Sequence, residues 1–262
     1  MTIVSYQKNF IFIKTNKTAG TSLEIALSKF CGKEDIIGPI FTQDEDLRKS
    51  KGFLGAQNFI NKTNAKKLNT GILKELVSSF IQLIPLAKKI YKFNYPPNFK
   101  FNRKLFIPNF IVNEHTSIKE VEKAVSNSFY NNSFKFTIVR NPYDQFLSYY
   151  FWQIHRKKFD PDRSFYDFVK SESYYFFNSE LNLLLDRNKK VNFNLIIKYE
   201  SLEKDLKKLN KEIGIDEDIY EIFKDIKTKS GLKKKENILD DKSKNLIYKN
   251  AKFFFEEFGY EH

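Results

Sequence analysis

A segment near the N-terminus carries the residue types that bind a phosphate. It spans residues 14–22, with the sequence KTNKTAGTS, and it joins an apolar run at Phe10–Lys14 to a helical pattern. A small residue lets the backbone approach an anion, and the N-terminus of a helix favours negative charge. The residues predicted to bind the anion supply close approach, hydroxyl donors and one full charge: Lys17, Thr18, Ala19, Gly20, Thr21 and Ser22. The nucleoside triphosphatase pattern GxxxxGK[ST] is absent. The alternative to an anion site is an ordinary small-residue turn that caps a helix.

A second group of anion-binding residues follows a later apolar run. Residues 134–140 end in Arg140, and Ser148 comes eight residues further on, about two turns into a predicted helix. Ligands bind at the carboxyl edge of open parallel sheets. The planar guanidinium of Arg140 suits a phosphate, and the hydroxyl of Ser148 adds a hydrogen bond. The alternative for Arg140 is a structural ion pair with Asp144.

One histidine has the position of a general base. His115 follows an apolar run at residues 110–112 and precedes Ser117, which has the capping-box spacing to Glu120. His115 is therefore predicted in a loop between a strand and a helix, where a lone histidine usually caps or packs. Glu114 is the adjacent alternative, either as the base or as the group that orients His115. The other two histidines are expected to be solvated or frayed: His155 and His262.

Three strand–turn–helix units are predicted to position these groups. Their strands are the apolar runs at 10–14, 134–140 and 192–199. The first helix is expected to stop at Gly32, the second to begin with Asn141 and Pro142, and the third to end at Gly214. Such units in series favour a parallel sheet between layers of helices. The sequence therefore predicts a single α/β domain over residues 1–262, with three layers and a P-loop-like connection.

Residues 49–109 break this pattern. They are rich in Lys and Asn and contain a turn with the sequence YPPN, so they are predicted to form an irregular or helical insertion on the substrate side. Residues 227–241 are predicted to form a basic surface loop before a last helix at 240–258.

Composition limits the class of protein. The 262 residues are 41% hydrophobic, which excludes a chain disordered throughout, and the single cysteine excludes an internal disulfide and a cysteine-based zinc site. The net charge of +13 favours anionic partners. We find no signal peptide or spanning segment, so a cytoplasmic protein is expected, with peripheral membrane contact through the Lys-rich segments left open. The sequence encodes neither the oligomeric state nor the acceptor.

The two anion-binding motifs, in this order, resemble those of sulfotransferases that use PAPS, 3′-phosphoadenosine 5′-phosphosulfate. Residues 15–22 resemble the 5′-phosphosulfate loop, and residues 139–142 with Ser148 resemble the 3′-phosphate site. The likeness is to the carbohydrate branch, the heparan and uronyl 2-O-type enzymes and their bacterial counterparts. It departs from the family pattern at Lys14 and Asn16, where many relatives have His and Pro.

The resemblance implies transfer of a sulfuryl group from PAPS to an acceptor hydroxyl, expected on a carbohydrate, without a metal. It implies that Lys17 stabilises the leaving 5′-phosphate and that His115 is the general base. A basic C-terminal loop closes over the 3′-phosphate in this family, and Lys233 and Lys234 match its position.

Two other functions stay open from the sequence. A P-loop-type nucleotide kinase or hydrolase would use the same loop, but the GK[ST] pattern and a magnesium-binding aspartate at a strand end are missing. A non-catalytic binder of nucleic acid or acidic glycan would explain the charge. No helix-turn-helix, RNA-recognition or zinc pattern accompanies it, so no specific nucleic acid is expected as a partner.

Overall fold

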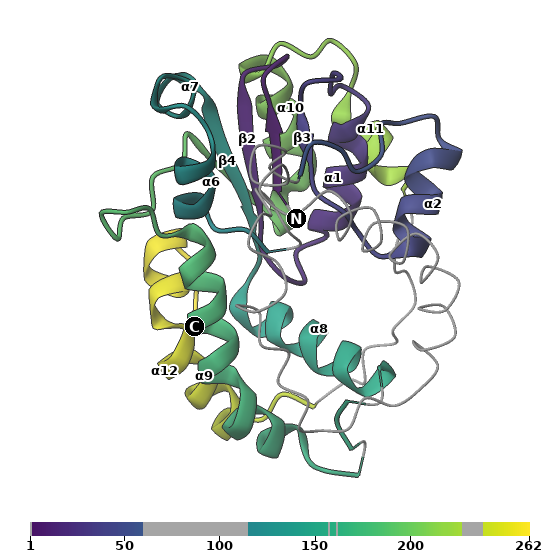
Figure 1. Cartoon of the computed structure of the whole chain (residues 1–262). Coiled ribbons are helices and arrows are strands. Elements are labelled where there is room, and N and C mark those ends of the chain that lie inside the picture. The colour runs from purple at the N-terminus through teal and green to yellow at the C-terminus, as the bar shows by residue number, and fades with distance from the viewer. Residues whose placement is uncertain (1, 60–114, 157, 161, 227–237) are drawn as a thin grey trace, which may run out of the picture. The chain divides into compact units, whose positions relative to one another are not determined.

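The computed structural model describes residues 2–59, 115–156, 158–160, 162–226 and 238–262. Its centre is a five-stranded sheet in the order β3-β1-β2-β4-β5 (Figure 1). The strands are β1 (Thr2–Ser5), β2 (Phe10–Lys14), β3 (Ile36–Ile37), β4 (Phe134–Val139) and β5 (Leu195–Lys198). β2, β4 and β5 lie within the three strands predicted from the sequence.

The sheet is mostly parallel rather than wholly parallel. β2 pairs in parallel with β4, and β4 with β5, as predicted. β1 runs antiparallel to both β2 and β3, which corrects the prediction of a parallel sheet. The reason is the connection from β1 to β2, residues 6–9, which is too short for the crossover that a parallel pair needs. Asp35 fixes this turn, because its Oδ1 accepts hydrogen bonds from the N–H groups of Tyr6 at 2.7 Å and Gln7 at 3.0 Å.

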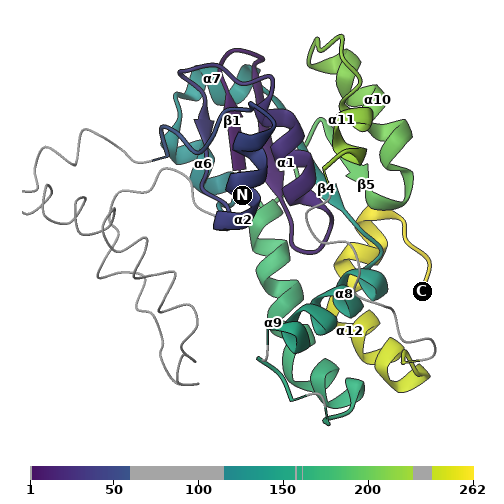
Figure 2. The same ribbon diagram turned by 90° about the vertical axis from the view of Figure 1, so that its right-hand side faces the viewer.

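Helices cover both faces of the sheet. They are α1 (Gly20–Ser28), α2 (Thr42–Ser50), α6 (Ile118–Ala124), α7 (Asn127–Asn132), α8 (Pro142–His155), α9 (Phe165–Leu184), α10 (Leu202–Glu212), α11 (Ile219–Lys224) and α12 (Asp241–Phe258), with a short 3₁₀ turn at Tyr199–Ser201. On one face, α1, α10 and α11 pack over Phe10, Phe12 and Phe136. Since strand side chains alternate, Ile11 and Ile13 point to the other face, where α9 lies against β2. Figure 2 shows α9 and α12 side by side with α8 across them.

The local start and stop signals of the sequence match most helix ends. Asn141 caps α8 by accepting a hydrogen bond from the Tyr143 N–H at 3.0 Å, and Pro142 is the first helical residue. α10 ends just before Gly214, whose φ is +60°. α1 ends at Ser28 and not next to Gly32, because the chain tightens there into bonds such as Phe30 N–H to Leu27 O at 3.0 Å.

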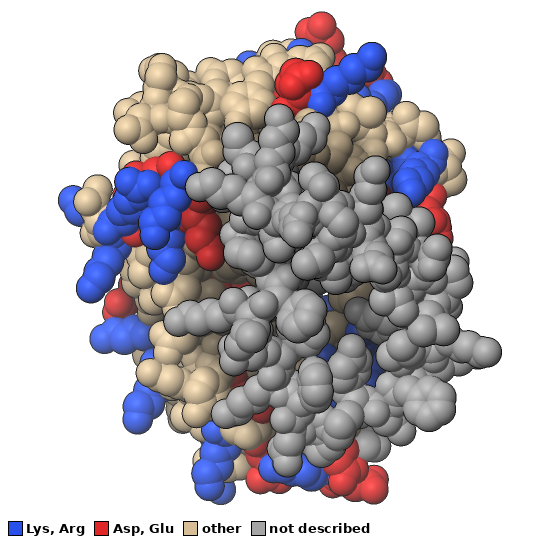
Figure 3. Space-filling view, viewed as in Figure 1, with Lys and Arg blue, Asp and Glu red and all other residues tan. Residues whose placement is uncertain are grey.

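The predicted insertion at 49–109 lies mostly outside the described residues, as does the basic loop over 227–237. Residues 49–59 are described; they complete α2 and pass along β3, where the backbone of Gln57 pairs with Ile37. In the described ranges, no helix has the length and apolar character needed to cross a bilayer. Basic and acidic side chains are interspersed around the described part of the face in Figure 3.

Candidate active site

The predicted phosphate loop connects β2 to α1. Its backbone enters the left-handed region at Lys17 and Ala19, each with φ of 61°. Ala19 is the N-cap of α1 and offers no side chain to cap the first helical turn. The N–H groups of that turn therefore keep the capacity to bind an anion.

Two threonines close the base of this loop. The hydroxyl of Thr15 is hydrogen-bonded to the carbonyl of Ile138, which ties the loop to β4. Thr18 is fully buried, and its hydroxyl donates to the carbonyl of Thr15 at 3.1 Å. Because the Thr18 hydroxyl is used inside the loop, its predicted contact with an anion is left to its backbone. Thr21 and Ser22 follow in the first turn of α1.

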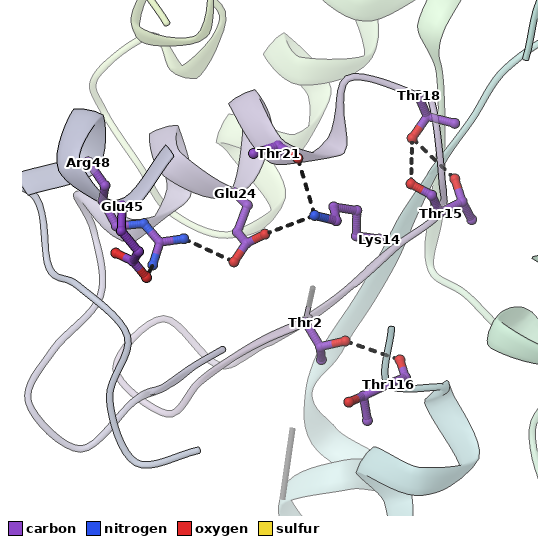
Figure 4. Close-up of polar contacts among 9 residues, drawn as sticks. All are labelled: Thr2, Lys14, Thr15, Thr18, Thr21, Glu24, Glu45, Arg48 and Thr116. Atoms are coloured by element: carbon purple, nitrogen blue, oxygen red, sulfur yellow. Dashed lines mark hydrogen bonds and ion pairs between the residues drawn. The ribbon is translucent and has the colours of Figure 1, made fainter. Parts of the chain in front are cut away.

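Lys14 crosses the start of α1 and explains the glycine there. A Cβ atom on Gly20 would lie 2.3 Å from Cγ of Lys14. Beyond Gly20, Nζ of Lys14 lies 3.2 Å from Oγ1 of Thr21 and 3.5 Å from Oε2 of Glu24 (Figure 4). An ammonium group only donates, so Oγ1 of Thr21 accepts this bond and keeps its own hydrogen for another acceptor.

Lys14 belongs to a set of four charges, three of them buried and Glu45 partly exposed, which we call the Glu24 cluster: Lys14, Glu24, Glu45 and Arg48. Nη2 of Arg48 lies 3.0 Å from Oε1 of Glu24, and Nη1 of Arg48 lies 3.1 Å from Oε1 of Glu45 (Figure 4). Glu24 and Arg48 are fully buried. Sequence reasoning missed this cluster; its signal is a glutamate between the apolar residues Leu23 and Ile25 of α1.

Arg140 brings the second anion-binding motif to the phosphate loop. It follows β4 directly, and its Nη1 donates to the carbonyl of Lys17 at 3.2 Å. Its guanidinium lies 4.3 Å from the ring centroid of Tyr199, and its buried Nε has no hydrogen-bond partner among the described residues. Arg140 forms no ion pair with Asp144 or any other carboxylate among the described residues, contrary to the structural alternative. Ser148 is half-buried in α8, and no contact between it and Arg140 is recorded in the described structure.

The ends of β4 and β5 are joined by a glutamate that the sequence did not single out. Glu200 follows β5; its Oε1 accepts from the backbone N–H of Asn141 at 2.7 Å, and its Oε2 accepts from the Tyr260 hydroxyl at 3.0 Å. Burial, together with the nearby Glu200 carboxylate, raises the pKa of Tyr260 above its ordinary value, so the phenol stays protonated and can donate. Glu200 therefore fixes the backbone that follows Arg140.

His115 lies at the same edge of the sheet. It is half-buried and stands directly before Thr116, whose carbonyl accepts a hydrogen bond from Thr2 Oγ1 at 3.1 Å (Figure 4). Thr2 pairs with Ile13, the residue before Lys14. The predicted capping box is present after His115, because the Glu120 carboxylate accepts from the backbone N–H of Ser117 at 2.7 Å.

The aromatic residues of α8 divide between the core and the loop. Tyr150 is buried against Phe165 and Phe168, as expected for core packing. Trp152 is half-buried, and Nζ of Lys17 lies 5.4 Å from its ring centroid. Trp152 therefore contacts the lysine that carries the full charge of the loop.

Three predicted site residues lie outside the described residues: Glu114, Lys233 and Lys234. The two other histidines of the chain are His155 and His262. His155 is exposed at the end of α8. His262 is exposed, as expected, although its ring stacks on that of Tyr248, with centroids 4.3 Å apart.

The chain was compared with protein families, curated proteins and solved structures. The family described as "Sulfotransferase family" matches residues 1–261 of the chain. No curated protein and no solved structure matches the chain.

Proposed function

Because the chain belongs to the sulfotransferase family, we propose that it transfers the sulfuryl group of PAPS to an acceptor hydroxyl, on a carbohydrate. The observation that carries the proposal is the hydrogen bond from Arg140 Nη1 to the Lys17 carbonyl, at 3.2 Å. This bond sets a guanidinium beside a helix N-terminus and a lysine. A nucleotide with phosphate groups at both ends needs two such adjoining cationic sites.

Two further observations fit a doubly phosphorylated nucleotide. In the described part of the chain, the buried Nε of Arg140 has no hydrogen-bond partner, and a phosphate oxygen would supply one. The first turn of α1 lacks a side-chain cap, which the 5′-phosphosulfate would replace. In this proposal Lys17, the backbone amides of residues 18–22 and the hydroxyls of Thr21 and Ser22 hold the 5′ end. Arg140 and Ser148 hold the 3′-phosphate, together with Lys233 and Lys234.

The reaction needs positioning and charge neutralisation more than covalent chemistry. The acceptor oxygen attacks sulfur, the bond from sulfur to the bridging oxygen breaks, and negative charge moves onto the 5′-phosphate. By analogy with phosphoryl transfer, the protein aligns the two oxygens and stabilises the leaving group. We assign the latter role to Lys17. We assign removal of the acceptor proton to His115, with Glu114 as the group that orients it or replaces it.

The two alternative functions gain no support. A nucleoside triphosphatase would have a lysine directly before Thr21, where this chain has Gly20. A binder of nucleic acid would favour a continuous basic surface, whereas the described part of the face in Figure 3 mixes basic and acidic side chains.

The proposal is tested by incubating the protein with PAPS and a panel of hydroxyl-bearing glycans and measuring release of PAP, 3′-phosphoadenosine 5′-phosphate. Lys17→Ala should lower turnover by about 10²-fold or more, because the leaving phosphate loses its compensating charge. Lys29→Ala, which removes an exposed lysine just after α1, is the matched control and should leave turnover unchanged. Full turnover by Lys17→Ala would refute the assignment, and hydrolysis of ATP with Mg²⁺ in place of PAPS turnover would favour the nucleotide kinase or hydrolase class.

His115→Ala separates the base from the binding machinery. Turnover should fall by about 10²–10⁴-fold, since general base catalysis is lost, while the affinity for PAP is retained. Calorimetric titration with PAP measures the second quantity. A collapse of PAP affinity in this variant would instead make His115 a structural residue.

A further inference from the structure

Asn16, between Thr15 and Lys17 in the phosphate loop, is held by two buried side chains from different helices. The Glu180 carboxylate of α9 accepts hydrogen bonds from the backbone N–H of Asn16, at 2.7 Å, and from its side-chain amide. Nε2 of Gln145, in α8, donates to the carbonyl of Asn16 at 2.7 Å and to the Glu180 carboxylate at 3.2 Å. Two neighbours thus engage the N–H, the carbonyl and the amide of one loop residue.

Glu180 is a buried carboxylate at a position where packing alone favours an apolar residue. Its side chain is 0% exposed and belongs to the apolar stripe of α9, with Phe176, Phe177, Leu183 and Leu184 one turn away on either side. Among the described residues, its hydrogen-bond donors are neutral amides rather than a lysine or arginine. Core packing alone favours an apolar residue at such a position, because burial of a carboxylate without a cationic partner costs free energy. The carboxylate therefore has a role in the loop that core packing does not explain.

The loop needs such support because its backbone is unfavourable. Lys17 and Ala19 both have φ of 61°, a region that residues other than glycine adopt only when their surroundings hold them there. Arg140 holds the carbonyl of Lys17 on one side. Glu180 and Gln145 hold Asn16 on the other side, directly before the first left-handed residue.

We propose that Glu180, together with Gln145, is a positioning residue for the sulfuryl donor. By fixing Asn16, the pair keeps Lys17 and the N-terminal amides of α1 in the arrangement that binds the 5′-phosphosulfate. Neither side chain touches the donor in this account; both act through the loop. The inference rests on the proposed function, because the donor is the ligand that the loop is arranged to hold.

The test compares four variants by calorimetric titration with PAP and by steady-state kinetics. Glu180→Leu removes both acceptors from Asn16 and should weaken PAP binding about tenfold or more. Gln145→Leu should weaken it several-fold. Glu180→Gln should retain most of the affinity, because the Asn16 amide can flip and accept from the new NH₂ group. Glu172→Leu, on the same helix and half-buried, is the matched control and should bind PAP as the wild type does.

The kinetic pattern separates positioning from general damage. The KM for PAPS should rise in Glu180→Leu and Gln145→Leu, while the KM for the acceptor stays the same. Hydrogen exchange of the amides in residues 15–22 should quicken in both variants, with α12 unchanged. This readout does not depend on catalysis.

Each outcome decides the proposal. If Glu180→Leu folds and binds PAP within twofold of the wild type, Glu180 does not position the donor. If Glu180→Leu does not fold, Gln145→Leu decides in its place, and unchanged PAP affinity in that variant overturns the proposal. If the wild type itself binds no PAP, the proposed function fails first, and faster exchange in residues 15–22 would then show only that Glu180 orders the loop.

Discussion

Two fully buried carboxylates, Glu24 and Glu180, flank the phosphate loop, and they are compensated in different ways. Glu24 in α1 faces two cations, Lys14 and Arg48. Glu180 in α9 accepts its hydrogen bonds from the amides of Asn16 and Gln145. One side of the loop is thus held by balanced charges, and the other side by a carboxylate among neutral donors.

This difference predicts different roles for the two carboxylates, Glu24 in stability and Glu180 in function. In the Glu24 cluster, every charge has an opposite neighbour, so the loss of one partner leaves another charge buried and uncompensated. At Glu180, burial of the negative charge lowers the stability of the folded protein. The same burial raises the pKa of this carboxyl to about 7 despite its hydrogen bonds. The first arrangement should dominate the free energy of unfolding, and the second should affect donor binding and the pH dependence of stability.

The largest effect on stability is expected from Glu24→Gln. This change removes the carboxylate that faces Lys14 and Arg48, and breaking a buried ion pair costs about 3–5 kcal/mol. Urea denaturation measures the free energy of unfolding. The control, Glu217→Gln, breaks an exposed pair with Lys29 and should cost less than about 1 kcal/mol. Equal losses of unfolding free energy in the two variants would mean that the buried cluster stabilises the fold no more than the exposed pair does.

Glu180→Gln should instead change how stability depends on pH. Between about pH 4.5 and 7 the folded protein keeps a proton on Glu180 that the unfolded chain has released, so the free energy of unfolding falls as pH rises through this window. Glu180→Gln abolishes this loss, which amounts to about 3 kcal/mol at most. Denaturation at pH 5 and pH 8 measures it. Parallel pH profiles for wild type and variant would contradict the account.

A smaller effect is expected from Gly20→Ala, which places a methyl group 2.3 Å from Cγ of Lys14. Overpacking of this kind costs about 1–3 kcal/mol, because the lysine must leave Thr21 and Glu24. The double variant Gly20→Ala with Lys14→Ala frees the space and tests the cause. If the added cost of Gly20→Ala is the same with Ala at position 14, the clash with Lys14 is not the reason.

The sequence predicted the features that depend on neighbouring residues. The capping box of Ser117 and Glu120 and the Asn141 cap are local patterns, and both are present. The anchors of the loop were missed because they join distant residues, as with Asn16 and Glu180, which are 164 positions apart. A glutamate in the apolar stripe of a helix signals burial, but it does not say which backbone group it faces.

Prediction from neighbouring residues has the same limit in the sheet. β2, β4 and β5 were found from apolar runs that precede polar turns, and their parallel pairing follows from the helices between them. β1 was missed because no helix separates it from β2. Only the length of the turn between them sets its antiparallel direction.

The central claim is that one nucleotide bridges the phosphate loop and Arg140, and titration calorimetry with PAP and with 5′-AMP tests it most directly. The two nucleotides differ only in the 3′-phosphate, so PAP should bind about tenfold more tightly or better, and Arg140→Met should erase that difference. Equal affinity of the wild-type protein for PAP and 5′-AMP would contradict the claim.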